Sequence, residues 1–168
     1  MPSSTDTALL EKIESLSFLR QLNDRLAEAA DFPAACTALV DLLWQERGLE
    51  IATYFSVEPG TTRLRLEAAA PALPQGRQVV HRGDAAPFAA LMAAVEPIVL
   101  AHPLPIPVAA PDAPDAVWLG VSLRVRGVPT GVLCVRTSAA PARLAEDARV
   151  LAIAATSAAL ALDVSRSG

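Results

Sequence analysis

Residues 117–135, with the sequence VWLGVSLRVRGVPTGVLCV, decide the fold of this chain. Aliphatic residues alternate with others through the first half, which predicts a β-strand with one aliphatic face and a second face carrying Trp118, Gly120, Ser122 and Arg124. Residues 127–130 predict a tight connection, and the apolar run 131–135 predicts a returning strand. This pattern indicates an antiparallel hairpin at the centre of a sheet, in a register that the alternation fixes.

A helix is predicted directly after this hairpin, over residues 141–165. Glu146 and Asp147 lie in its first turns, where carboxylates are favourable against the helix dipole. One face of the helix carries Leu151, Ala154, Ala158 and Leu162. The small alanines permit close contact with a neighbouring helix or sheet.

Two helices are predicted at the other end of the chain, over residues 8–48. Between residues 8 and 30, leucine or isoleucine recurs every three or four positions, which is typical of an amphipathic helix of about six turns. Asp31 offers an N-cap and Pro33 suits a first turn, so a second helix begins here and ends at Gly48. Residues 49–57 and 63–67 then predict a strand pair joined by a turn at 58–61.

The middle segment, residues 71–114, is rich in proline, which breaks long elements. Short pieces are predicted between the prolines: strands at 78–81 and 98–101, and a helix at 88–95 with Leu91, Met92 and Val95 buried. We therefore expect one domain over residues 1–168, with N-terminal helices (8–48), a sheet (49–137) containing the variable segment 71–114, and a C-terminal helix (141–165). Helices at both ends of a run of antiparallel strands predict an α+β fold.

The hairpin and last helix resemble those of the GAF domain family. Residues 118–135 are similar to the family's closing hairpin, an apolar strand with PLxxxG followed by a GVL strand, although Ser122 replaces the usual proline. Residues 144–154 are similar to its helix start, FxEEDxxLLxxLA, with Leu144 where phenylalanine is common.

The resemblance implies a profilin- or PAS-like central antiparallel sheet of about six strands. It further implies terminal helices packed on one face and short helices and loops over the other, with a small-molecule pocket under the variable segment. Dimerisation through the terminal helices is also implied. Fold resemblance alone identifies no ligand.

Seven residues are candidates for lining this pocket. If the aliphatic face of strand 116–126 packs on the helices, Trp118, Ser122 and Arg124 point toward the opposite face. The same alternation sets Tyr54 and Ser56 opposite Ile51 and Phe55, from where they would reach the same space. Ordinary core or rim packing is the alternative for Trp118 and Tyr54.

His81 and His102, from the segment that would roof the pocket, are candidate hydrogen-bond donors to an anionic ligand. With Asp84 they are chemically able to bind a metal ion, but their spacing matches no metal-site signature, and no metal is expected. The sequence identifies no cofactor.

Composition excludes several classes of function. A formal net charge of -4 with scattered arginines argues against direct nucleic-acid binding. The longest helical apolar run, 150–162, is too short to span a bilayer, and residues 1–11 are polar and acidic, unlike a signal peptide. We therefore expect a cytoplasmic protein without membrane insertion.

The leading hypothesis is a sensory or regulatory domain of a bacterial signal-transduction or transcription-control protein. It would bind a small molecule or partner and signal through its terminal helices, as a homodimer. The alternative is a degenerate dimerisation or interaction scaffold that uses the face Ala154, Ala158 and Leu162.

A redox enzyme of the methionine sulfoxide reductase type is the third hypothesis. Members of that branch carry catalytic cysteines in pocket loops, whereas Cys36 and Cys134 are both expected to be buried thiols and residues 71–114 contain no cysteine. No catalytic template matches the sequence, so no enzymatic activity and no catalytic residue are expected.

Overall fold

The computed structural model describes residues 3–73, 80–106 and 115–167. The elements follow one another in the order α1 (Ser4–Glu28), α2 (Phe32–Arg47), β1 (Ile51–Val57), β2 (Arg63–Ala70), β3 (Val80–Arg82), α3 (Phe88–Ala93), β4 (Ile98–Val99), β5 (Ala116–Val125), β6 (Val128–Ser138) and α4 (Pro141–Ser167). Helices at both ends of an antiparallel sheet confirm the predicted α+β class.

The sheet has six strands in the order β3-β2-β1-β6-β5-β4, and all neighbouring strands are antiparallel. Its longest pairing is the β5–β6 hairpin, as the alternation in 117–135 predicts. The connection is tighter than predicted, because only Arg126 (φ 54°) and Gly127 (φ 77°) form the turn and β6 already begins at Val128. Two successive left-handed residues match the twist of the flanking strands.

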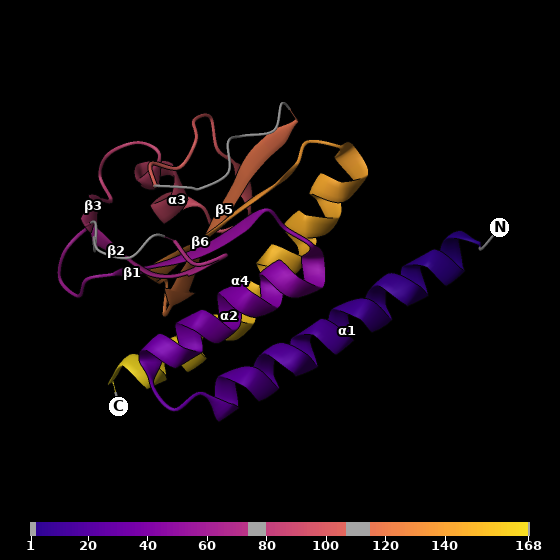
Figure 1. The fold of residues 1–168 in the computed structure, drawn as a ribbon, viewed down its shortest axis with the longest axis horizontal. Helices are drawn as coiled ribbons and strands as arrows, with labels where there is room; N and C mark the ends of the chain where they lie inside the picture. Colours follow the sequence, from indigo (N-terminus) through magenta and orange to yellow (C-terminus); the bar gives the residue numbers. More distant parts are fainter. Residues whose placement is uncertain (1–2, 74–79, 107–114, 168) are drawn as a thin grey trace.

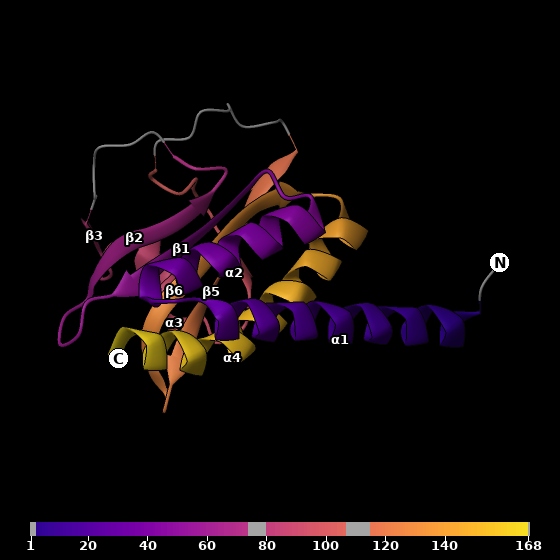
Figure 2. The same ribbon diagram turned by 60° about the horizontal axis from the view of Figure 1, so that its bottom comes forward.

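The helices form two layers on one face of the sheet, which we call the helix face (Figure 1). Helices α2 and α4 cover the sheet directly, and α1 lies across both of them as an outer layer. Helix α3 packs against β5 and β6 on the opposite face, which we call the loop face. The first turns of α1 extend beyond the rest of the molecule (Figure 2).

Each face of the sheet has its own apolar core. Leu119, Val121 and Leu123 of β5 belong to the helix-face core, whereas Trp118 belongs to the loop-face core, as predicted. Strand β1 is buried on both faces. The division of β5 between the two cores therefore follows from the sequence, whereas its pairing with β6 shifts in register between Leu123 and Arg124.

Helix α4 buries the face that the sequence predicts, with Leu151, Ala154, Ala158 and Leu162 almost free of solvent. The same finding contradicts the prediction that Ala154, Ala158 and Leu162 form an interaction surface, because all three lie in the helix-face core. The alanines let α4 approach the sheet closely, and they are not available to a partner.

The caps of α2 are as predicted. Asp31 Oδ1 accepts a hydrogen bond from the Ala34 amide at 2.9 Å, and Gly48 ends the helix in the left-handed region at φ 60°. Helix α1 begins earlier than predicted, at Ser4, because Ser3 and Asp6 form a capping box.

The short middle elements deviate more from the prediction. Helix α3 ends at Ala93, and Val95, which was predicted to be buried, is exposed. Strand β4 spans only Ile98–Val99. Strand β3 covers Val80–Arg82, while residues 78 and 79 of the predicted strand lie outside the described residues.

Helix α4 is long and apolar enough to cross a membrane by length and composition alone, since one 18-residue window has a mean hydropathy of 1.5. This window is longer than the run 150–162 considered in the sequence. A core helix of a soluble protein passes the same test, and α4 packs against β5, β6, α1 and α2.

Candidate functional site

The loop face holds Trp118, Ser122 and Arg124, as predicted, but two of the three side chains anchor α3. Ser122 Oγ donates to the Ala94 carbonyl at 2.8 Å, and Arg124 Nη2 donates to the Met92 carbonyl at 2.6 Å. Arg124 Nε also donates to Ser122 Oγ at 3.0 Å. These contacts satisfy carbonyls at the C-terminal end of α3, where a helix leaves acceptors unpaired.

The prediction that Tyr54 and Ser56 share a face with Trp118 is wrong. Tyr54 lies opposite Leu133 of β6 and belongs to the helix-face core, where burial raises the pKa of its hydroxyl. Ser56 donates to Glu67 Oε1 at 2.6 Å. Both faces of β1 are buried, so the chain alternates between two apolar environments and its sequence does not reveal which face is which.

The two histidines occupy different settings. The His81 ring lies 5.7 Å from the Phe55 ring and 4.8 Å from the Phe88 ring, and burial lowers the pKa of His81. His102 is exposed. Asp84 pairs with Arg82 at 2.9 Å, and the described residues contain no group of three or more His, Cys, Asp or Glu side chains that could hold a metal ion.

Side chains fill the space where a pocket was expected on the loop face. Leu91 of α3 packs so closely over Gly120 that a Cβ at this position would lie 2.1 Å from Leu91 Cδ2. Phe88, Leu100 and Leu104 complete this core. In the described part of the chain, the region between α3 and the sheet is therefore a packed apolar layer.

Two polar groups are nevertheless buried in this layer. Trp118 is 5% exposed, and its Nε1 hydrogen has no acceptor among the described residues. Arg136, 1% exposed, lies opposite Trp118 on β6 with its guanidinium carbon 6.0 Å from the indole ring, and its Nε donates to Glu50 Oε2 at 2.6 Å.

Sequence reasoning missed Arg136. The available signal was a charged residue directly after the apolar run 131–135, in a strand predicted to be central. A buried guanidinium is costly unless it is paired, and the ion pair with Glu50 offsets part of this cost.

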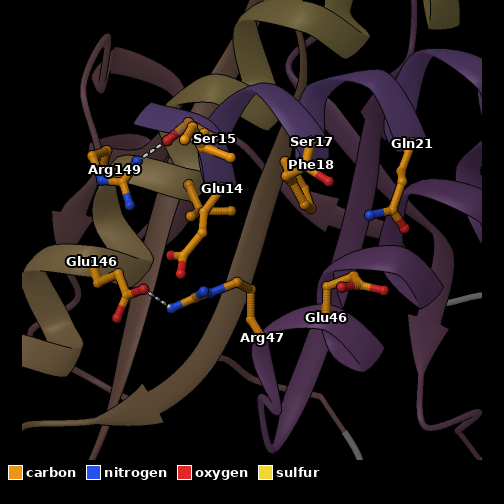
Figure 3. A pocket seen from close by; sticks show the side chains of 11 residues that line it. Glu14, Ser15, Ser17, Phe18, Gln21, Glu46, Arg47, Glu146 and Arg149 are labelled. Carbon is orange, nitrogen blue, oxygen red and sulfur yellow. Dashed lines mark hydrogen bonds and ion pairs between the residues drawn. The ribbon is translucent and has the colours of Figure 1, made fainter. Parts of the chain in front are cut away.

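On the helix face, a cleft of about 470 Å³ lies where α1, α2 and α4 meet. Figure 3 shows Glu14 from α1, Arg47 from α2 and Glu146 from α4 pointing into it. Arg47 Nη2 pairs with Glu146 Oε1 at 2.9 Å, and Arg149 donates to Ser15 Oγ. We call this feature the helix-junction cleft.

Asp147, 3% exposed, holds the polar network behind this cleft. Its carboxylate accepts hydrogen bonds from Arg47 Nε at 3.2 Å, from Arg143 Nε at 2.8 Å and from the Thr137 hydroxyl. The network joins α2, α4 and β6. In the sequence, Glu146 and Asp147 are equivalent, since either carboxylate is favourable near the N-terminus of a helix. Only the fold shows that Asp147 is the buried one.

Both cysteines are buried thiols, as predicted. Burial raises the pKa of Cys36 to about 12 and raises that of Cys134 further. Neither thiol has the exposed, electropositive setting of a reactive cysteine.

Comparisons by sequence find no match, either to a protein-family model or to a curated protein. Structural comparison finds a GAF domain of A. aeolicus in an inactive state, with a TM-score of 0.73 and 11% identity over 92% of this chain and 98% of that one.

Two further solved structures are similar. The GAF domain of an Acinetobacter phosphoenolpyruvate-protein phosphotransferase has a TM-score of 0.65 at 15% identity, covering 89% of this chain and 95% of that one. The free methionine-R-sulfoxide reductase of Neisseria meningitidis, solved with its substrate, has a TM-score of 0.67 at 20% identity, covering 99% and 96%.

Proposed function

We propose that this chain, which has the fold of a GAF domain, is a regulatory domain in which the loop face controls the packing of the helices on the other face. The observation that carries the proposal is the pair of adjacent residues Arg136 and Thr137 on β6. Arg136 lies against Trp118 on the loop face, and Thr137 donates to Asp147 on the helix face.

This pair offers a short physical connection between the two layers. A movement of Trp118 or Arg136 would shift β6, and the next residue on that strand holds the Asp147 carboxylate together with Arg47 and Arg143. Packed elements change between discrete arrangements because interiors are dense, so a small shift at β6 can alter how α2 and α4 meet.

Helices α1 and α4 are suited to carry such a change out of the domain. They run in parallel, with Arg149 beside Ser15 near one end of the contact, and with Leu160 and Leu26 lining one cavity near the other. The N-terminal end of α1 and the C-terminal end of α4 lie at opposite sides of the molecule (Figure 1). A signal could therefore enter along α1 and leave along α4, in a cytoplasmic protein of a bacterial signalling or transcription-control system.

In this proposed role the chain is a non-enzymatic domain. The methionine-R-sulfoxide reductase fold neighbour raises a redox alternative, but both thiols of this chain are buried with raised pKa values. A specific observation favours a second candidate function, an interaction scaffold without a ligand, since side chains fill the described loop face.

A double-mutant cycle tests the connection through β6. Trp118→Phe perturbs the loop face, and Thr137→Val removes the hydroxyl that holds Asp147. We expect Trp118→Phe to raise hydrogen exchange in the first three turns of α4 severalfold, and we expect this effect to shrink when Thr137 is already valine.

Thr130→Val is the matched control, because Thr130 lies on the same strand and its hydroxyl donates to the Leu123 carbonyl of the neighbouring strand and not to Asp147. Additive effects of Trp118→Phe and Thr137→Val on α4 exchange would contradict the proposal. Such a result, with no thermal stabilisation by any small molecule, would favour the scaffold.

A further inference from the structure

The helix-junction cleft has the size and the lining of a small-molecule site. Its volume of about 470 Å³ lies within the range of roughly 300–1,000 Å³ that such sites occupy. Phe18 and Val150 are buried apolar parts of its wall, and charged side chains from α1, α2 and α4 surround them. The cleft lies on the helix face, so it is separate from the pocket that the GAF resemblance implies on the loop face.

Two of the charged side chains that line the cleft neutralise each other. Arg47 Nη2 pairs with Glu146 Oε1 at 2.9 Å, and Arg47 Nε also contacts the buried Asp147 carboxylate at 3.2 Å. The charge of Arg47 is therefore met by carboxylates of the protein itself. This ion pair forms part of the wall and leaves the recognition of a ligand to other side chains.

Three further side chains bring charges that ion pairs within the protein do not neutralise. Arg149 donates to the Ser15 hydroxyl and, at 3.5 Å, to the Glu11 carbonyl, and both acceptors are neutral. Glu14 and Glu46 are exposed, and in the described part of the chain neither side chain forms an ion pair or a hydrogen bond. The cleft thus offers a ligand one guanidinium and two carboxylates.

These three charges lie in two places (Figure 3). Arg149 and Glu14 lie at one end of the cleft, where Glu14 directly precedes the serine that Arg149 contacts. Glu46 lies at the other end. Helix α1 lines the cleft over residues 13–21, which corresponds to about 12 Å along the helix axis. The cleft is therefore long enough for an extended ligand.

The order of the charges selects one layout of ligand. A carboxylate and an ammonium group close together would meet Arg149 and Glu14, and a second cation at the far end would meet Glu46. A simple acid would leave both glutamates unmet, and a simple diamine would leave the guanidinium unmet. An aliphatic stem between the two ends would lie on Phe18 and Val150, as the stems of basic side chains do on apolar surfaces.

We propose that the helix-junction cleft binds a basic α-amino acid, whose carboxylate pairs with Arg149, whose α-ammonium pairs with Glu14 and whose side-chain cation pairs with Glu46. Such a ligand contacts α1, α2 and α4 together and fixes how α1 sits on the other two helices. The inference goes beyond the proposed function, because it concerns the helix face and requires no signal through β6.

Isothermal titration calorimetry of the full chain at low salt tests the proposal, with L-lysine as the probe. Norleucine lacks only the side-chain ammonium, and cadaverine lacks only the carboxylate. We expect saturable binding of lysine. Norleucine should bind at least about threefold more weakly, since Glu46 is exposed and solvent screens its ion pair. Cadaverine should bind at least about tenfold more weakly, since a guanidinium–carboxylate pair is stronger.

Two variants assign the ends of the ligand. Glu46→Gln should reduce lysine affinity to that of norleucine and leave norleucine affinity unchanged. Arg149→Met, which keeps the aliphatic stem, should reduce lysine affinity to that of cadaverine without weakening cadaverine. Glu28→Gln is the matched control, because Glu28 is an exposed glutamate of α1 that does not line the cleft, and it should change none of the three affinities.

Three results would overturn the inference. The first is the absence of saturable lysine binding to the folded wild-type chain. The second is norleucine or cadaverine binding as tightly as lysine, which would remove the role of one end of the cleft. The third is an equal loss of lysine and norleucine affinity in Glu46→Gln, which would show that this residue does not meet the side-chain cation.

Discussion

At the residue scale, Asp147 is the best example of a role that depends on burial. Glu146 and Asp147 are neighbours in α4, and both contact Arg47. The Glu146 side chain is partly exposed, so solvent screens its ion pair, which is worth about 0–1 kcal/mol. Asp147 is enclosed by two guanidiniums and a hydroxyl, and its removal leaves these donors facing each other.

We predict that Asp147→Ala destabilises the protein by about 3 kcal/mol, because breaking a buried ion pair leaves uncompensated charge. Glu146→Gln, which neutralises the adjacent carboxylate, should cost less than about 1 kcal/mol. Urea unfolding followed by circular dichroism measures both. Equal costs for the two variants would show that Asp147 does not organise the network.

At the element scale, α3 shows how a short segment depends on the sheet beneath it. Six residues cannot maintain a helix by propensity alone. Here Phe88 and Leu91 are buried, and β5 supplies donors for the Met92 and Ala94 carbonyls. The position of α3, and with it the covering of Gly120, is therefore set by Ser122 and Arg124.

We predict that Arg124→Lys raises amide hydrogen exchange in α3 about tenfold without changing global stability by more than about 1 kcal/mol. A lysine ammonium cannot reproduce the planar fork with which Arg124 contacts Met92, Gly127 and Ser122 together. Arg126→Lys is the control, since Arg126 is exposed in the adjacent turn. Unchanged exchange in α3 would mean that apolar packing alone holds this helix.

At the scale of the whole molecule, α1 has two apolar stripes. Phe18 and Leu22 lie on the stripe that packs against the domain, whereas Leu9, Ile13 and Leu16 are more than half exposed. At about 100° per residue the two stripes are centred roughly 170° apart around the helix. The first turns of α1 project from the molecule (Figure 2), and the outer stripe runs from there to Leu16.

We propose that a second copy of the chain covers this outer stripe. In a parallel pair of α1 helices, positions 9, 13 and 16 would occupy successive d, a and d sites of a heptad. Phe18 then falls at an f site, directed away from the partner and into its own domain. In this one register, the outer stripe faces the partner helix while the inner stripe packs against its own domain.

We predict that Leu16→Glu weakens self-association at least about tenfold, because it places a charge in the apolar seam. Leu160→Glu is the matched control, since Leu160 is an equally exposed leucine of α4 that lies outside the stripe. Sedimentation equilibrium gives the dissociation constants. A wild-type chain that remains monomeric, or equal weakening by both substitutions, would reject the α1 interface.

Local sequence pattern predicts those parts of the fold in which the pattern and the environment coincide. Strand β5 has a clear alternation, so Leu119 and Trp118 could be assigned to opposite faces. Asp31 and Gly48 set the ends of α2 through their own side-chain and backbone chemistry. The buried face of α4 followed from the spacing of Leu151 and Leu162.

Contacts between residues far apart in the sequence depend on how the elements pack. Tyr54 was assigned to the wrong face because β1 is buried on both sides. Arg136 and Asp147 owe their ion pairs to Glu50 and Arg47, which are 86 and 100 positions away. Periodicity records whether a position meets water or the interior. It does not record which of two interiors a side chain enters, or which partner meets it there. The positions of Trp118 and Arg136 in the loop-face layer, and the polar network of Asp147, depend on both.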